Sequence, residues 1–504
     1  MKLFQNNLIH KVFIILSLNF IFAQFSFATD TSQLASFTEQ GMALWHVPGM
    51  SVAVVSKDKI LFQQGFGKTA INNGQDVDEN TLFSIASTTK AMVVSGILIL
   101  VDEGKLSLDD PISKHIPELH FNDPLLTQKI TVRDLLAHRT GLPSTDYWSF
   151  FQDMPLAEQI TRLKTVPIAS PIRTRLIYQN TMFEIAGLLI ERLSGKSWHE
   201  FLTNRLWQPL GMSSTFAKRE QIEKKHTYVT PYHFKDDKLT KADWNFPASL
   251  ANAAGSVWSS IHDMSLWAQF LLGDGVTAQG DRLIDQSSFT QMFEPHQLSN
   301  ESDFYPTVKL TKPNWRSYGL GWFQQDFQGR KIDFHTGSLS GLIAIIGLDR
   351  AENKAVIALG NRDHAEMRHA LLWEVMDNSA ADKRRDWNKD IFELYNSNAN
   401  SREEKWQKTL DKRLKNTKPS VSKSQYLGTY QNETFGDIQI VKSANNLLLK
   451  TKLVAFKMSH WHLDSYLVEY KPWGMRDFAT YNIGADGKVT SMQLFGMTFD
   501  RLSE

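Results

Sequence analysis

Residues 87–101 read STTKAMVVSGILILV, and this stretch decides how the rest of the chain is interpreted. The run from Ala91 to Val101 is apolar on nearly all sides of a helix, which predicts a helix inside the core rather than on the surface. Its most apolar part, Val93–Val101, has about half of the roughly 20 residues that a bilayer-spanning helix needs. Ser87 and Lys90 come directly before this run. A serine and a lysine are therefore expected one turn apart at the start of a buried helix.

This pair has the residue types of an activated nucleophile. A serine hydroxyl is a weak nucleophile without a base beside it, and a buried lysine can be that base because burial disfavours its charged form. The spacing alone is weak, and it recurs in a predicted hairpin turn and in a polar linker, at Ser56/Lys59 and Ser420/Lys423. Only Ser87 opens a buried helix, so its position selects it. The structural alternative is that Ser87 merely caps the helix.

Strand-like runs on both sides of this helix predict one antiparallel sheet. Met50–Ser56 and Ile60–Gly67 form a predicted hairpin. Further strands are expected downstream, at Tyr318–Phe327, Lys331–Phe334, Leu342–Leu348 and Ala355–Leu359. Helices are expected between the two groups, at Arg133–Ala137, Thr181–Leu193, Ser197–Leu206 and Asp263–Leu272. The predicted fold class is α/β (α+β), an antiparallel sheet flanked by helices with an inserted, mainly helical region.

The composition changes after the last predicted strands of this sheet. Residues 382–415 are dense in charged side chains, which predicts a solvated helical connector. Strand patterns then return, at Gly428–Gln431, Asp437–Val441, Asn446–Lys452, Leu467–Tyr470, Phe478–Tyr481 and Met492–Phe495. Asp486-Gly487 is a hairpin turn signal. We expect a small C-terminal all-β, barrel-like domain.

Two more short segments carry side chains suited to a reactive site. Tyr178-Gln179-Asn180 precedes a helical run, and His335-Thr336-Gly337-Ser338 ends a predicted strand before a turn. A glycine on a strand edge lets a substrate backbone approach closely. Each segment is weak alone, and each has a structural reading. Tyr178 can be a core tyrosine with a satisfied hydroxyl, Asn180 a helix cap, and His335 a satisfied strand-end histidine.

Taken in order, these segments resemble a known family. Ser87-x-x-Lys90, Tyr178-x-Asn180 and His335-Thr336-Gly337 are similar to the three motifs of class C β-lactamases and DD-peptidases, a superfamily that also holds serine esterases and D-aminopeptidases. The resemblance covers about residues 35–375, and further segments agree with it at residues 130–142, 209–212 and 253–256. Residues 426–430 resemble the accessory β-domain often attached to this family. The resemblance implies a β-lactamase/transpeptidase-like fold.

The resemblance also implies a role for each motif residue. Ser87 would attack a carbonyl and become acylated, with Lys90 and Tyr178 sharing the proton transfers. Which of the two takes the first proton is left open. The backbone N–H groups of Ser87 and Ser338 would form an oxyanion hole. Asn180 would hold the substrate amide.

The resemblance places His335, Thr336 and Gly337 beside the far end of the substrate. His335 stands where a lysine is most common in β-lactamases. An unperturbed histidine titrates near ~6.5. We therefore expect the preference for a carboxylate substrate to depend on pH.

Overall composition narrows the partners of this protein. Its 504 residues contain no cysteine, which excludes disulfides, cysteine-ligated metals and a cysteine nucleophile, and its formal net charge is +1, which predicts no attraction to nucleic acid or anionic lipid. No metal or cofactor is expected. The expected partner is a small-molecule or peptide substrate, including cell-wall peptides. The oligomeric state is left open.

The N-terminal segment predicts export. Residues 1–28 have a basic start, an apolar stretch and small residues before a cleavage site, which is typical of a signal peptide; the alternative is an uncleaved anchor. The expected location is periplasmic or extracellular. The domain prediction is residues 1–28 as signal peptide, 29–380 as hydrolase domain, 381–420 as charged linker and 421–504 as β-domain.

The predicted function is a serine hydrolase that forms an acyl-enzyme on Ser87. Its substrates would be amides, lactams or esters, and the natural one is left open because substrate choice depends on pocket shape. The alternative is a protein that binds penicillin or peptidoglycan peptides without turnover.

Overall fold

The computed structural model describes residues 31–222, 226–242, 252–299, 305–339, 341–444, 446–471 and 474–503. The predicted signal peptide lies outside these residues. No helix within these ranges is both long and apolar enough to cross a bilayer.

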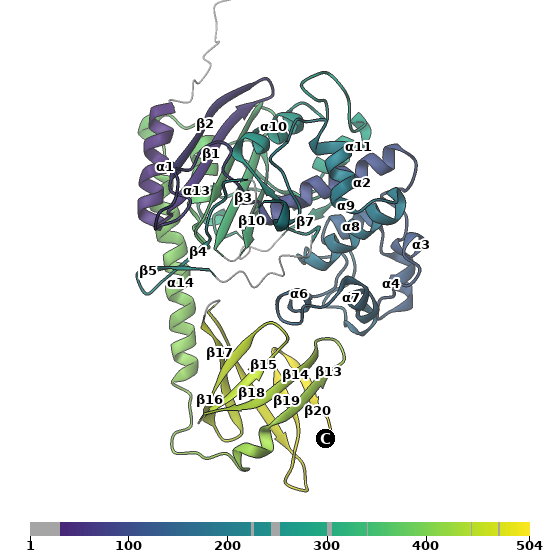
Figure 1. The fold of residues 1–504 in the computed structure, drawn as a ribbon, viewed down its shortest axis with the longest axis vertical. Helices are drawn as coiled ribbons and strands as arrows, with labels where there is room; N and C mark the ends of the chain where they lie inside the picture. The colour runs from purple at the N-terminus through teal and green to yellow at the C-terminus, as the bar shows by residue number, and fades with distance from the viewer. Residues whose placement is uncertain are drawn as a thin grey trace, which may run out of the picture.

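An eight-stranded antiparallel sheet forms the centre of the larger body (Figure 1), in the order β2-β1-β12-β11-β10-β9-β8-β7. The strands are β1 (Gly49–Ser56), β2 (Lys59–Gly67), β7 (Gln297–Leu298), β8 (Arg316–Tyr318), β9 (Phe323–Phe327), β10 (Arg330–Leu339), β11 (Leu342–Asp349) and β12 (Lys354–Gly360). The N-terminal hairpin joins the late strands through β1, because Met50 pairs with Gly360 and Val55 with Ala355. The predicted pairing of the two groups is confirmed.

Both faces of the sheet are buried, which explains the nearly continuous apolar strands. Ala53 and Val55 of β1 pack into one core, while Val52 and Val54 pack into the other. The first core lies under α2 (Thr89–Asp102) and α10 (Ile261–Leu272), and the second under α1 (Thr31–Trp45) and α13 (Met367–Met376). The predicted helix-flanked antiparallel sheet is confirmed.

The helical region lies between the two groups of strands in sequence. It comprises α3 (Ile112–His115), α4 (Pro124–Lys129), α5 (Val132–Leu136), α6 (Tyr147–Phe150), α7 (Leu156–Arg162), α8 (Asn180–Ser194), α9 (Trp198–Leu202) and α11 (Gln286–Phe293). Two short hairpins accompany it, β3 (Phe83–Ser84) with β6 (Trp258–Ser259) and β4 (Tyr232–Lys235) with β5 (Lys238–Lys241). A short helix, α12 (Val308–Thr311), precedes β8.

The C-terminal residues form a closed eight-stranded barrel. Its strands are β13 (Gly428–Asn432), β14 (Gly436–Ser443), β15 (Asn446–Lys450), β16 (Ala455–His462), β17 (Ser465–Tyr470), β18 (Met475–Ile483), β19 (Val489–Leu494) and β20 (Met497–Arg501). Phe151 at the end of α6 packs in the core of the barrel, and Trp148 donates a hydrogen bond to the Thr434 carbonyl at 2.7 Å. The barrel is therefore docked on the helical region.

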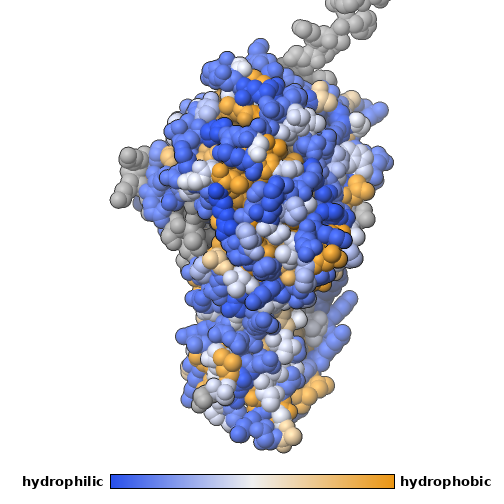
Figure 2. Space-filling model, turned by 90° about the vertical axis from the view of Figure 1, so that its right-hand side faces the viewer, coloured by the Kyte–Doolittle hydropathy of each residue, from blue (hydrophilic) through white to orange (hydrophobic). Residues whose placement is uncertain are grey.

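The charged connector forms the long helix α14 (Trp387–Leu410). Its first turns bury Trp387 and Ile391 against the sheet domain, and further along Glu403 pairs with Arg476 of the barrel at 2.8 Å. In Figure 1 this helix runs down one side of the molecule from the larger body to the barrel. Figure 2 shows hydrophilic residues over most of one face, with apolar residues in small groups on both parts.

Two predicted elements differ from the structure, and two strands of the barrel were not predicted. The run Tyr318–Phe327 is two strands, because a tight turn with Gly321 at φ 77° separates β8 from β9. The helix predicted over Ser197–Leu206 changes at Thr203 to a π-helical turn. In the barrel, β16 and β20 were missing from the prediction. Both expose alternate polar side chains and have few buried positions, so their strand pattern is faint.

Candidate active site

Ser87 lies on a strained turn between β3 and the buried helix α2. The turn is a short 3₁₀ segment, Ala86–Thr88, and Ala86 has a φ of 45°. Such a left-handed backbone is costly for a residue with a Cβ and persists only where the surroundings hold it. Two glycines allow neighbouring backbone to pack closely against this turn and hold it. A Cβ on Gly337 would lie 2.2 Å from the Ile85 carbonyl oxygen, and a Cβ on Gly255 would lie 3.3 Å from the Ala86 carbonyl carbon.

Ser87 does not cap α2. The cap position is Thr88, and it makes no side-chain cap hydrogen bond. The Ser87 Oγ instead accepts a hydrogen bond from Lys90 Nζ at 3.1 Å. The same ammonium donates to Asn180 Oδ1 and to the Ala254 carbonyl, each at 2.7 Å. All three protons of a lysine side chain are thereby accounted for.

Lys90 is fully buried although it carries a titratable amine. Burial lowers its pKa from 10.5 to about 7, and the negative charges of Asp146 and Glu184 act in the opposite direction. A substantial share of the amine is therefore neutral near pH 7, as a proton acceptor needs to be.

Tyr178 also contacts the same serine. A hydrogen bond joins its hydroxyl to Ser87, while burial raises the pKa of the phenol well above 10. Lys90 Nζ lies 4.9 Å from the centre of the Tyr178 ring. The His138 ring packs on Tyr178 with centroids 4.3 Å apart. Tyr178 is thus a hydrogen-bonded cleft residue rather than a plain core tyrosine.

Asn180 is fixed at both ends of its amide. Its Oδ1 accepts from Lys90, and its Nδ2 donates to Asp146 Oδ2 at 3.0 Å. It is the first residue of α8, whose cap position is Gln179, so it does not serve as the helix cap. Burial raises the pKa of the Asp146 carboxyl, while the charge of Lys90 opposes that rise. The polar chain therefore continues from Ser87 through Lys90 and Asn180 to Asp146.

A second carboxyl, Glu184, is half-buried and acts on Lys90 by its charge. It accepts a hydrogen bond from Asn252 and makes none to Asn180. Burial raises its pKa to about 6.

Strand β10 carries the third group of predicted residues past the nucleophile. It pairs with β9 only up to Phe334, so from His335 onward one edge of the strand has no partner strand in the described part of the chain. Thr336 shares a hydrogen bond of 2.8 Å with the Tyr305 hydroxyl. Ser338 lines the cleft together with Ser87.

Arg368 is hydrogen-bonded to the part of β10 that carries Gly337 and Ser338. Its guanidinium donates to the Gly337 carbonyl and to Ser338 Oγ, the latter at 2.7 Å. It is buried and paired with Glu366 at 3.0 Å. The buried ion pair therefore fixes the strand segment that faces Ser87.

His335 differs from the expectation. Its ring is 1% exposed, with Nε2 3.1 Å from the Tyr318 hydroxyl and Nδ1 2.7 Å from the Thr336 carbonyl. Burial lowers its pKa to about 3. The premise of a histidine titrating near neutrality is wrong, because a neutral, hydrogen-bonded ring cannot switch charge between pH 5 and 8. The reading as a satisfied strand histidine fits the structure.

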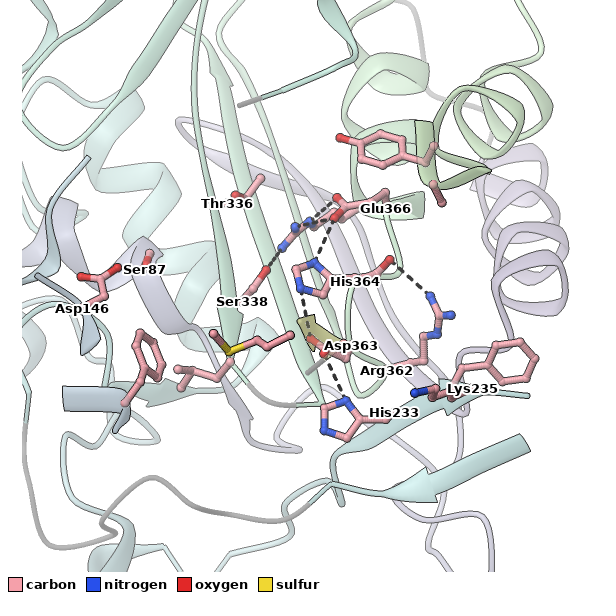
Figure 3. A pocket seen from close by; sticks show the side chains of 18 of the residues that line it. Ser87, Asp146, His233, Lys235, Thr336, Ser338, Arg362, Asp363, His364 and Glu366 are labelled. Carbon is pink, nitrogen blue, oxygen red and sulfur yellow. Dashed lines mark hydrogen bonds and ion pairs between the residues drawn. The ribbon is translucent and has the colours of Figure 1, made fainter. Parts of the chain in front are cut away.

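A cleft of about 1380 Å³ between the sheet domain, α14 and the barrel is lined by Ser87, Asp146, Tyr178, Asn180, Thr336 and Ser338. Figure 3 shows Ser87 and Asp146 on one side of it, Thr336 and Ser338 beyond them, and a charged group around Asp363 and His364 on the other side. The barrel contributes Tyr470, Lys471, Gly474 and Met475 to the lining. The cleft thus joins both domains.

Several residues of this site escaped the sequence analysis. Asp146, Glu184 and Arg368 sit at no distinctive spacing from the motifs, and only the fold brings them together. Ala254 was noted only as part of a family segment, although its carbonyl contacts Lys90 directly.

Comparison with known proteins places both parts of the chain. The Beta-lactamase family profile matches residues 34–381, and a domain of unknown function, DUF3471, matches residues 412–503. Unguisins hydrolase ungD' of Aspergillus campestris (strain IBT 28561) is 28% identical over 384 residues, which are 70% of this chain and 67% of that protein. Protein flp of Staphylococcus aureus (strain COL) is 25% identical over 339 residues, which are 65% of this chain and 62% of that protein.

Solved structures agree on the fold. The octameric penicillin-binding protein homologue from Pyrococcus abyssi superposes with a TM-score of 0.61 at 19% identity, covering 93% of this chain and 99% of that one. A mutant class C β-lactamase gives a TM-score of 0.55 at 20% identity, covering 69% and 98%. Since the family profile covers most of the chain and the fold agrees, this protein belongs to the β-lactamase family of serine hydrolases.

Proposed function

We propose that this protein hydrolyses ester, lactam or amide bonds through an acyl-enzyme on Ser87. One observation carries the proposal. The Ser87 hydroxyl lies 3.1 Å from a buried amine whose pKa is lowered to about 7, and it is also hydrogen-bonded to a phenol. An activated serine needs such a neighbour to accept its proton.

In the acylation step, Lys90 takes the first proton. Ser87 Oγ bonds to the substrate carbonyl carbon while its proton passes to the neutral Lys90 amine. Tyr178 remains protonated at this stage, because burial raises the pKa of its phenol. Negative charge then develops on the carbonyl oxygen, where the N–H groups of Ser87 and Ser338 would stabilise it.

Collapse of the tetrahedral intermediate completes acylation. The bond to the leaving group breaks as Tyr178 donates its proton to that group, and the Lys90 ammonium returns the proton to the phenol. Water then attacks the ester on Ser87 by the reverse sequence, releasing the acid and restoring the serine. Asn180 holds the Lys90 amine in place throughout.

A paired assay tests this function. The protein is incubated with a fluorescent penicillin and with a p-nitrophenyl ester, while intact mass and released p-nitrophenol are followed. We expect product release by the native protein and none above background by Ser87→Ala, because no other group replaces the hydroxyl. A persistent adduct would indicate a penicillin-binding protein without turnover, and equal behaviour of the two proteins would exclude both functions.

Asp146 supplies a prediction about pH. Asp146→Asn keeps a hydrogen-bond acceptor for Asn180 but removes the charge that raises the pKa of Lys90. The amine then stays neutral to lower pH, so we expect the acid limb of kcat/KM for a neutral ester to move down by about one pH unit. Asp146→Ala also removes the acceptor and should lower kcat.

Two variants serve as comparisons for that measurement. Glu184→Gln removes the other anion near Lys90 without touching Asn180, so it should move the acid limb in the same direction with less effect on kcat. Asp58→Asn changes an exposed carboxyl in the β1–β2 turn and should leave the profile as it is. An unchanged acid limb in Asp146→Asn would mean that Asp146 does not influence the catalytic amine.

A further inference from the structure

The end of the cleft away from Ser87 has an excess of positive charge. Six basic side chains line the whole cleft, Lys235, Lys241, Arg362, Arg368, Arg402 and Lys471, against three carboxyls, Asp146, Asp363 and Glu366. Asp146 lies beside Ser87, so it does not offset the charge at the far end (Figure 3). The chain as a whole is nearly balanced, with 55 basic and 54 acidic residues. The positive charge is therefore a local property of this cleft.

Both carboxyls at the far end already have cationic or hydrogen-bonding partners. Asp363 lies 3.1 Å from His233 Nδ1, and Glu366 pairs with Arg368 at 3.0 Å. His364 lies within 3.6 Å of Glu366, whose contact raises the pKa of that imidazole. An ammonium group entering this end would meet no carboxylate without a partner among these residues.

Arg362 differs from these paired residues. Its guanidinium packs 5.3 Å from the Phe234 ring and 6.0 Å from the Trp45 ring, which restrains it. Within the described ranges it forms no ion pair with a carboxylate. The guanidinium donates a hydrogen bond of 3.2 Å to the His364 carbonyl, and its Nε is buried without a hydrogen-bond partner among the described residues. Asp363 and Glu366 act on Arg362 through their charges but do not pair with it directly. A restrained guanidinium without a directly paired carboxylate is suited to bind an anion.

Three separate parts of the chain bring the other cations to the lining of this cleft. Lys235 and Lys241 come from the β4–β5 hairpin, Arg402 from α14, and Lys471 from the barrel. The Lys235 ammonium donates to the Lys471 carbonyl at 3.2 Å, so the hairpin and the barrel meet at this end. None of these four side chains pairs with a carboxylate in the part of the chain that the structure describes.

We propose that the far end of the cleft, centred on Arg362, binds a carboxylate carried by the substrate at a distance from the bond that Ser87 attacks. This inference rests on the proposed function. It moves carboxylate recognition away from His335, whose buried ring carries no charge, to the side of the cleft that the barrel and the β4–β5 hairpin enclose. The barrel then has a part in substrate selection through Lys471.

Matched substrates test this site. The mono-p-nitrophenyl esters of linear dicarboxylic acids are compared with the same chains ending in a carboxamide or an amine, and a second series places these three groups on the leaving phenol. We expect the carboxylate form to exceed the carboxamide form in kcat/KM by about tenfold or more in one series, the range of one charge-assisted hydrogen bond. The ratio should fall as salt is added.

Variants are judged by the same ratio. Arg362→Gln should bring it close to one, and Arg362→Lys should retain part of it. Lys241→Glu and Lys471→Glu should lower the ratio and favour the amine form of the substrate. These two variants test the site independently if Arg362→Gln does not fold. Lys442→Glu changes an exposed lysine of the barrel outside the cleft and should leave the ratio as in the native protein.

Binding to Ser87→Ala separates this inference from the proposed function. Calorimetry with this variant measures the affinity of intact carboxylate, carboxamide and amine forms without any turnover. A carboxylate preference there supports the site even where the native protein fails to hydrolyse any ester. Equal affinities, or a preference for the amine, would overturn the inference. Ser87-dependent hydrolysis is decided separately, by the assay with the fluorescent penicillin and the p-nitrophenyl ester.

Discussion

Replacing Lys90 by Met is expected to lower kcat/KM for ester hydrolysis by about 10³- to 10⁴-fold, the upper range for loss of a general base. Met has similar length and suits the fully buried site, whereas the amine that takes the Ser87 proton is gone. The change also leaves Asn180 Oδ1 and the Ala254 carbonyl without their donor. Steady-state kinetics with a p-nitrophenyl ester measures the loss, and circular dichroism with thermal unfolding checks the fold.

Lys90→Arg is the decisive companion variant. A guanidinium keeps the positive charge and the donors but does not lose its proton in proteins. If Lys90 acts as a base, Arg at this position leaves the enzyme as inactive as Met does. Recovery of activity in Lys90→Arg would show that the site needs only a cation beside Ser87, which would contradict the proposed proton transfer.

The sequence was informative wherever a run of apolar residues had to be buried. The run after Lys90 is apolar on all sides and too short to span a bilayer, so it predicted a core helix with Ser87 and Lys90 at its buried start. The structure places both residues in contact with the side chains of Tyr178 or Asn180. The pairing of the N-terminal hairpin with the late strands followed from the apolar strand patterns at both ends of the domain. These features depend on burial, which periodicity reports directly.

Features that depend on three-dimensional proximity could not be read in this way. Asp146 raises the pKa of Lys90 by its charge and also accepts a hydrogen bond from Asn180. Arg368 reaches β10 from α13, which follows two strands later. The opposite error occurred at His335. Its residue type predicted a contact that titrates near neutral pH, but burial beside Tyr318 lowers its pKa and keeps the ring neutral. Residue type sets what a side chain can do, and its neighbours set its charge.

Gly337→Ala is expected to lower kcat by about 100-fold, the scale of a 1 Å misplacement in an active site. The new Cβ would lie 2.2 Å from the Ile85 carbonyl oxygen and 2.9 Å from the Ala86 Cβ. Backbone on the turn that carries Ser87 cannot rotate aside as a side chain can, so β10 and the nucleophile must separate. The N–H of Ser338 and the Ser87 hydroxyl would then no longer face one carbonyl group.

Gly347→Ala on the neighbouring strand is the matched control. Its Cβ would also meet an atom at 2.2 Å, but that atom is the Cδ1 end of the Leu372 side chain in the core. A flexible terminus can change rotamer, so this variant should lose stability without losing kcat at a temperature well below its unfolding transition. Equal kcat values for Gly337→Ala and Gly347→Ala would show that close contact between β10 and the Ser87 turn is not required for catalysis.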